Sequence, residues 1–167
     1  MVLAIVYFDD IKRTVGGAMI GTHKAVARSK TQAESAPQNR PETTPGTVEL
    51  IAGPHGHFFA EAEINGRRIP VMVDTGASLV ALSHEDARRV GIHVQQGDYK
   101  YTVSTANGPA RIAVIELDSV TIGDITVHGV RAAVGERGAL KTTLLGMSFL
   151  GRLRRAEMRQ GRLILEN

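Results

Sequence analysis

Short runs of alternating apolar and polar residues recur along residues 47–167, and two-residue turn signals separate them. The turn signals are Asn65-Gly66, Asn107-Gly108, Gly123-Asp124 and Gln160-Gly161. The tightest hairpin turns need positive φ at their central positions, which Asn and Gly adopt most readily. This pattern predicts an all-β fold built from short strands, arranged as a compact barrel or sandwich.

The alternation also locates the individual strands. The predicted strands are Phe58–Ile64, Ile69–Val73, Tyr99–Thr105, Arg111–Leu117, Val120–Ile122, Ile125–Val127 and Leu163–Leu165. One helix is predicted as well, because Ser83 and Asp86 form a capping box and Gly91 provides a helix end.

Residues 1–46 have a different composition from the rest of the chain. Met1–Phe8 is apolar but far shorter than the roughly 20 residues of a membrane span, and it lacks the basic start of a signal peptide. Apolar residues near helical spacing continue to residue 28, so residues 1–28 are predicted to form an apolar and amphipathic helical segment. Residues 29–46 contain three of the six prolines and no large apolar residue, which predicts a flexible linker before a domain at 47–167.

Composition excludes several kinds of site. The chain has no Cys, so disulfides, a cysteine nucleophile and a thiolate zinc site are all excluded. Aromatic residues make up 4% of the chain and Trp is absent, which does not fit the basic stripe with interleaved aromatics of a nucleic-acid binder. The five arginines of residues 151–167 are therefore interpreted as a solvated face, and no nucleic-acid partner is expected.

The segment Val71–Ser78 carries the most informative chemistry in the chain. Three apolar residues bring Asp74 to the end of a predicted strand, although Asp is disfavoured within strands. Gly76 allows the backbone to approach closely, and Thr75 offers a hydroxyl that can bond inside a buried site. Taken alone, the tripeptide Asp74-Thr75-Gly76 also fits a turn in which the Asp caps a loop.

Two further elements follow Asp74 along the chain. The first is the Asn-Gly hairpin at Thr105-Ala106-Asn107-Gly108, and the second is the apolar run Thr143–Leu150, which contains Leu145-Gly146. In their order and spacing, Asp74-Thr75-Gly76 and these two elements resemble the retropepsin-like aspartic proteases. With Gly56-His57-Phe58 upstream and the run continued to Leu150, the fuller pattern resembles their bacterial single-domain branch. The resemblance covers residues 47–167.

The resemblance implies a closed acid-protease barrel with one or two short helices. It also implies an endopeptidase that hydrolyses peptide bonds with a water activated between two carboxylates, without a metal or cofactor. Asp-Thr-Gly occurs once in this chain, so the resemblance further implies a homodimer in which each copy supplies Asp74.

By the same resemblance, Asp74 is the catalytic residue, and Thr75, Gly76 and Ala77 support it. The residues expected to form the flap over a peptide or protein substrate are Thr105, Ala106, Asn107 and Gly108, and those of the substrate-site wall are Leu145 and Gly146. Because retroviral dimers are held by interleaved terminal strands, Leu163-Ile164-Leu165 is the expected interface strand.

Two departures from the retroviral pattern are visible. Ser78 and Met147 stand where retroviral members carry a paired Asp and Arg, which indicates that packing has replaced the ion pair. Pro109 follows the flap tip and is expected to stiffen it.

Other interpretations stay open at this point. The chain also fits a catalytically silent module of the same fold that binds peptides or dimerises, although such a module has no reason to retain Asp74-Thr75-Gly76. His55 and His57 form an H-x-H pair, but no third ligand has a convincing spacing, so exposed or capping histidines are the preferred interpretation.

The N-terminus bears on the location of the protein. Met1–Phe8 matches the tail of a membrane helix that begins upstream, as in bacterial relatives that hold the protease domain outside the cytoplasm. This hypothesis places the domain in the periplasm, attached to the inner membrane through its N-terminus. The alternative is a soluble protein.

Overall fold

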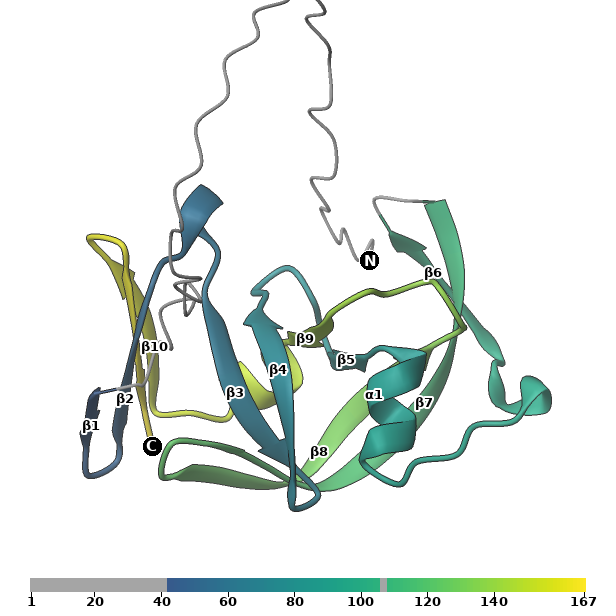
Figure 1. Cartoon of the computed structure of the whole chain (residues 1–167), viewed down its shortest axis with the longest axis horizontal. Helices are drawn as coiled ribbons and strands as arrows, with labels where there is room; N and C mark the ends of the chain where they lie inside the picture. Colours follow the sequence, from purple (N-terminus) through teal and green to yellow (C-terminus); the bar gives the residue numbers. More distant parts are fainter. Residues whose placement is uncertain (1–41, 106–107) are drawn as a thin grey trace, which may run out of the picture. The chain divides into compact units, whose positions relative to one another are not determined.

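The computed structural model describes residues 42–105 and 108–167 (Figure 1). The strands are β1 Glu42–Thr44, β2 Thr47–Ile51, β3 Phe59–Ile64, β4 Arg67–Val73, β5 Val80–Leu82, β6 Tyr101–Thr105, β7 Gly108–Ile122, β8 Ile125–Gly135, β9 Thr143–Leu145, β10 Arg155–Arg159 and β11 Arg162–Glu166. The helices are α1 His84–Arg89 and α2 Met147–Leu150, and the 3₁₀ turns are η1 Pro54–Gly56 and η2 Gln96–Asp98. The predicted N-terminal helical segment, residues 29–41 and the flap residues Ala106 and Asn107 lie outside the described residues.

The larger sheet has seven strands in the order β3-β4-β9-β5-β8-β7-β6, and β3 also pairs with β7. The extra pairing closes the sheet, because Ala62, Glu63 and Ile64 of β3 lie opposite residues 120–122 of β7. Two pairings are parallel, β4 with β9 and β5 with β8, and the others are antiparallel. The predicted all-β fold with a closed barrel and short helices is confirmed.

The smaller sheet has the order β1-β2-β11-β10 and is antiparallel throughout. β1 lies within the stretch predicted as linker and pairs with β2 around Pro45-Gly46. Gly46 has φ +75°, the positive value that a Pro-Gly turn of type II requires at its second central position. The Pro-Gly pair therefore marks a hairpin turn here, and not only a linker.

β11 lies inside the smaller sheet, hydrogen-bonded to β2 on one side and to β10 on the other. Leu163 and Leu165 are 3% and 0% exposed and belong to the main hydrophobic core, together with Val48 and Leu50 of β2. The prediction that Leu163-Ile164-Leu165 forms an intermolecular strand is wrong for this structure. Both edges of β11 are already paired within the chain, and its leucines are needed by the chain's own core.

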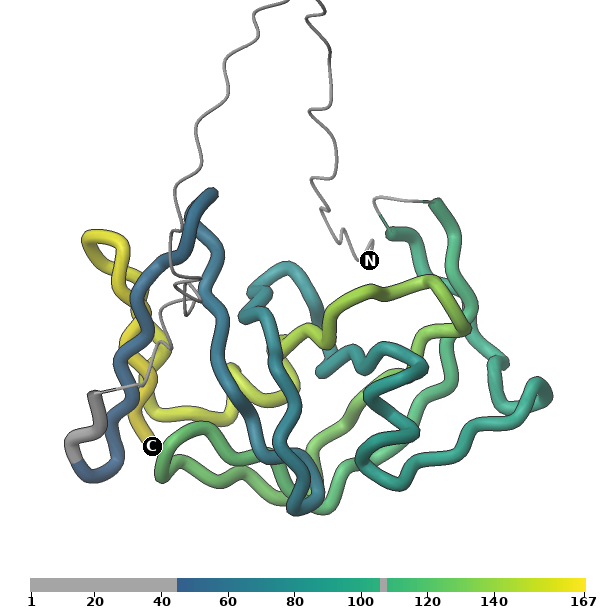
Figure 2. Tube along the Cα trace, in the orientation of Figure 1, coloured from purple at the N-terminus to yellow at the C-terminus, as the bar shows by residue number. Residues whose placement is uncertain are grey.

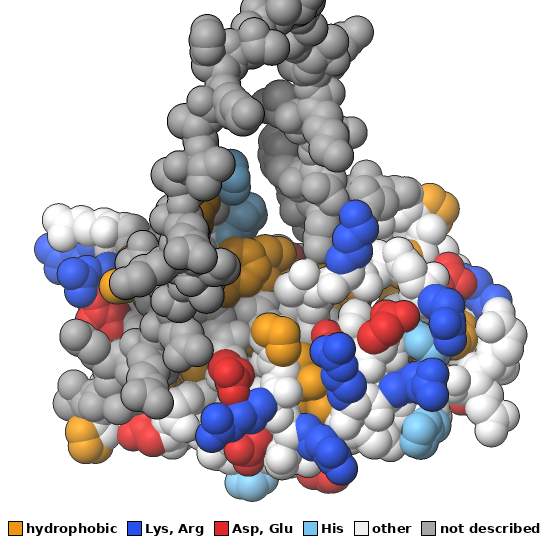
Figure 3. All heavy atoms as spheres, in the orientation of Figure 1, with side chains coloured by type: hydrophobic (Ala, Val, Ile, Leu, Met, Phe, Trp, Pro, Cys, Tyr) orange, Lys and Arg blue, Asp and Glu red, His pale blue; other side chains and the backbone are white. Residues whose placement is uncertain are grey.

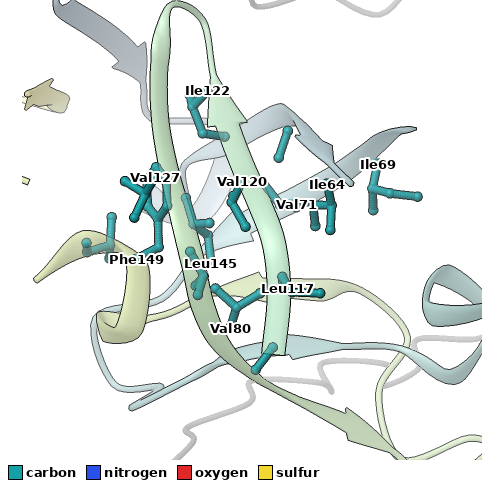
Figure 4. Packing of buried hydrophobic residues seen from close by; sticks show 14 of the residues in the cluster. Ile64, Ile69, Val71, Val80, Leu117, Val120, Ile122, Val127, Leu145 and Phe149 are labelled. Carbon is teal, nitrogen blue, oxygen red and sulfur yellow. The ribbon is translucent and has the colours of Figure 1, made fainter. Parts of the chain in front are cut away.

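The core joins the two sheets. Figure 4 shows side chains from β3, β4, β5, β7, β8, β9 and α2 packed together, with Phe149 beside Val127. Phe149 is fully buried, which ties the short helix α2 to the barrel. Burial of this kind stabilises a fold by about 25 cal/mol per Å² of apolar area removed from water.

The long strands exceed the lengths predicted for them. β7 runs as one strand of 15 residues and β8 extends to Gly135, where the sequence predicted shorter segments (Figure 2). The polar residues Asp118 and Ser119 indicated a break, but their side chains lie at exposed and half-buried positions of a continuous strand. Helix α1 matches its prediction, since the Ser83 side chain accepts a hydrogen bond from the Asp86 amide.

No helix within residues 42–105 and 108–167 combines the length and the apolar character needed to cross a bilayer.

Replacing Leu165 with Ala is expected to lower the free energy of unfolding by about 2–5 kcal/mol, because it leaves a cavity in the core. The half-buried neighbour Ile164, replaced in the same way, is the control and should cost clearly less. Urea unfolding measures both. A Leu165→Ala chain that kept its unfolding midpoint but lost self-association would instead assign β11 to an interface.

Candidate active site

Asp74 lies immediately after β4, where that strand runs parallel to β9. Its backbone amide donates to the Leu145 carbonyl over 3.1 Å, which fixes the chain at the strand end. The side chain is held within its own loop, because the Gly76 amide donates to Asp74 Oδ1 over 2.8 Å. A second bond, from the Ala77 amide to the Asp74 carbonyl over 3.2 Å, completes a tight turn around the carboxylate.

The turn leaves the carboxyl group accessible. Asp74 is half-buried, Thr75 and Gly76 are exposed, and Ala77 is buried with 1% exposure. Within the described part of the chain, Asp74 Oδ2 accepts no hydrogen bond. The loop therefore immobilises one carboxylate oxygen and leaves the other open to a water, a substrate or a second chain.

The segment after β9 packs tightly against this loop. The Met147 amide donates to the Ala77 carbonyl over 2.8 Å. A Cβ on Gly146 would lie 2.1 Å from the Leu79 carbonyl oxygen and 2.6 Å from that of Ala77. Only a residue without a side chain fits at 146, so the Leu145-Gly146 pair lies directly beside the loop that carries Asp74.

A buried polar cluster fixes the start of β9. Thr143 Oγ1 donates to Asp86 Oδ2 over 2.7 Å and accepts from the Ser83 amide over 3.2 Å. Ser83 Oγ donates to the same Asp86 oxygen over 2.9 Å, and Arg89 donates to Asp86 Oδ1 over 3.0 Å. Every buried side-chain nitrogen or oxygen of the cluster has a hydrogen-bond partner, so the cluster ties the start of α1 to the strand that leads to Gly146.

Two polar residues that support the segments around Gly146, Thr143 and Ser148, were not identified from the sequence. Thr143 was seen only as part of an apolar run, yet it is fully buried and bonded to a residue 57 positions away. Ser148 Oγ accepts a hydrogen bond from the Val80 amide over 2.8 Å. The sequence did contain a signal for both residues, because each places a hydroxyl group at one end of Leu144–Met147 within an otherwise apolar run.

The β6–β7 hairpin carries Thr105 and Gly108, two of the residues predicted to form a flap (Figure 1). Thr105 and Gly108 are paired at its end, and Thr105 Oγ1 donates to the Gly108 carbonyl over 2.7 Å. Gly108 has φ +104°, which favours glycine at this position. Pro109 lies opposite Ser104 at the edge of the hairpin, which tolerates a residue without an amide hydrogen.

The foot of this hairpin is anchored by Tyr99, which is buried with 5% exposure. Its hydroxyl lies 3.1 Å from His84 Nδ1, and its carbonyl accepts from Arg111 over 2.6 Å. Burial, together with the nearby Glu136 and Asp98 carboxylates, raises the pKa of the Tyr99 hydroxyl above its usual value. Tyr99 is thus a neutral hydrogen-bonding group that joins the β6–β7 hairpin to α1.

His55 and His57 are both exposed, and the His57 ring meets Phe59 edge-on at 6.4 Å. Within residues 42–105 and 108–167, no three His, Asp or Glu side chains come together as metal ligands.

Comparison with known proteins places this geometry in a family. Residues 60–152 match the family described as "gag-polyprotein putative aspartyl protease". A crystal structure of a retropepsin-like aspartic protease from Rickettsia conorii is similar, with a TM-score of 0.64 and 38% identity, over 72% of this chain and 98% of that one.

Two curated bacterial proteins are also similar. An uncharacterized protein of Rickettsia prowazekii (strain Madrid E) is 38% identical over 129 residues, and an uncharacterized protein in the cobV 5′ region of Sinorhizobium sp is 42% identical over 113 residues. The matches cover 77% and 68% of this chain, and 55% and 48% of those proteins, respectively. The chain spans about half the length of these curated relatives.

Replacing Gly146 with Ala is expected to destabilise the fold by about 3 kcal/mol or more, because the new Cβ would overlap two backbone carbonyls that cannot move without shifting the Asp74 loop. Gly97→Ala is the control, since nothing lies within 4 Å of its Cβ position. Chemical unfolding measures both. Equal unfolding midpoints for the two variants would show that the stability of the fold does not depend on the close packing of residues 77–79 against Gly146.

Proposed function

This chain belongs to the gag-type aspartyl protease family and has the retropepsin-like fold, and on that premise we propose that it is an aspartic endopeptidase active as a homodimer. The observation that carries the proposal is the setting of Asp74. Its carboxylate stands at a strand end, held by the Gly76 amide on one oxygen and open on the other. A turn that merely capped a loop would not need the tight packing of Gly146 behind it.

The dimer follows from the count of suitable carboxylates. Asp-Thr-Gly occurs once in the chain, whereas activation of a water between two carboxylates needs a pair. A two-fold axis beside Asp74 would supply the second carboxylate from an identical chain. Thr75 and Gly76 are exposed in the single chain and lie next to that axis in the proposed dimer.

The proposed mechanism uses the pair as a joint acid and base. Two carboxylates in contact cannot both be ionised, so the pair holds one proton. The ionised member takes a proton from the water between them, and the oxygen of that water attacks the peptide carbonyl carbon. The protonated member donates to the carbonyl oxygen, and transfer of a proton to the leaving nitrogen breaks the C–N bond.

The flap gives the substrate its expected conformation. An extended peptide lying between the Asp74 loop and the β6–β7 hairpin can pair with backbone groups as an added strand. Backbone pairing positions the peptide without reading its sequence, so side-chain pockets along the cleft would provide the selectivity.

Replacing Asp74 with Asn should lower peptide turnover at least about a thousandfold, because Asn cannot ionise while it keeps the shape of Asp. The Asn variant should fold as the wild type does. Asp118→Asn, at an exposed position of β7, is the matched control and should retain activity. Hydrolysis of a peptide library, read by mass spectrometry, measures all three chains.

Substantial activity in Asp74→Asn would contradict the mechanism. A folded wild-type chain that binds peptides but cleaves none would instead match the silent-module interpretation.

A further inference from the structure

A hollow of about 380 Å³ lies beside the Asp74 loop, and nothing in the proposed mechanism uses it. Its lining includes Ser78, Met147, Ser148, Arg131 and Arg152. The two arginines come from β8 and from the segment after α2, whereas Ser78 and Met147 continue the two segments that form the candidate active site.

The hollow is joined to the active site by backbone contacts. Ser78 directly follows Ala77, whose carbonyl accepts the Met147 amide at 2.8 Å. Ser78 is four residues from Asp74, so their Cα atoms lie at most about 14 Å apart. An extended peptide advances about 3.3 Å per residue, so a side chain two to four residues from the bond beside Asp74 has the reach to enter the hollow.

The side chains that line the hollow favour an anion. Arg152 is fixed in place, because its NH1 group donates to the His128 carbonyl over 2.5 Å and to the Gly129 carbonyl over 3.0 Å. Arg131 makes no ion pair within the described residues, and no carboxylate lines the hollow. Glu116 lies opposite Arg131 on β7, and its Oε1 is 3.6 Å from the Cβ position of Gly129, which also lines the hollow.

Hydroxyl groups add hydrogen-bond donors to the same hollow. Ser148 Oγ accepts from the Val80 amide, which leaves its own hydrogen available to a ligand. On the face seen in Figure 3, Lys and Arg side chains are interspersed with Asp and Glu. A hollow lined by two arginines without a carboxylate differs from that mixed surface.

We propose that this hollow is a substrate subsite that selects an Asp or Glu side chain two to four residues from the cleaved bond, with Arg131 as the residue that determines the selection. A guanidinium binds a carboxylate through two parallel N–H···O bonds, which distinguishes an acid from its amide. Arg152 and the serine hydroxyls complete the site. The inference rests on the proposed function, because it names the substrate class of the same cleft.

The test begins with cleavage of a peptide library by the wild-type chain, followed by pairs of peptides that differ only in Glu or Gln at one position. At one position, two to four residues from the cut, kcat/KM for the Glu peptide should exceed that for the Gln peptide about tenfold. Arg131→Gln should abolish the preference, so that the Glu and Gln peptides are cleaved with equal kcat/KM. Arg67→Gln, at an exposed position of β4, is the control and should keep it.

Two results would overturn the proposal: equal rates for Glu and Gln at every such position, and a preference that survives Arg131→Gln. Arg131→Lys is the control for a folding defect, because it keeps the positive charge but cannot form the two parallel hydrogen bonds. This variant should retain only part of the preference for Glu.

A measurement of peptide binding distinguishes failure of the proposed function from failure of the subsite proposal. Fluorescence anisotropy with labelled Glu and Gln peptides on the Asp74→Asn chain should show tighter binding of the Glu peptide, lost when Arg131→Gln is added. That result, without turnover by the wild type, would keep the subsite and refute the protease. Equal affinities on the folded chain would refute the subsite.

Discussion

The close packing of Gly146 against the Ala77 and Leu79 carbonyls is the constraint on which the rest of the site depends. No side chain fits between these segments, so the backbone of residues 145–147 lies directly on the loop that carries Asp74. Two hydrogen bonds require the segments to lie this close together. One runs from the Asp74 amide to the Leu145 carbonyl, and the other from the Met147 amide to the Ala77 carbonyl. At the start of β9, the buried Thr143–Asp86–Ser83 cluster fixes the same strand to α1. The carboxylate is therefore positioned by backbone contacts and a satisfied polar cluster, which limit its motion more than a surface loop would.

The smaller sheet changes where a second copy can bind. β11 is hydrogen-bonded to strands of its own chain along both edges, and its leucines fill the core. Neither edge is therefore free to pair with a strand of a second chain. Within that sheet, β1 and β10 are the edge strands. β10 carries Arg155, which bonds Glu157 and Glu166, and charged side chains of this kind protect an edge from unspecific pairing. A dimer of this chain is thus not held by the interleaving of β11 in the arrangement described.

The local signals in the sequence predicted their own structures well. Asn65-Gly66 turns the β3–β4 hairpin, Gly123-Asp124 turns the β7–β8 hairpin, and Ser83 caps α1, because each depends on neighbouring residues only. The placement of Leu145-Gly146 beside Asp74 came from resemblance to a family, since the parallel pairing of β4 with β9 joins segments that are distant in the chain. The central position of β11 and the bond between Thr143 and Asp86 were missed for the same reason: they are set by packing between remote segments, which no local pattern encodes.

The central claim is that one chain holds half of a catalytic site and a second copy completes it. Mixing wild-type and Asp74→Asn chains in equal amounts, under conditions of subunit exchange, tests this directly through the specific activity per total chain. Random pairing leaves about a quarter of the dimers with two Asp74 carboxylates, so activity should fall to about a quarter of the wild-type value. Activity of about one half, unchanged by further exchange, would show that each chain acts alone and would contradict the account.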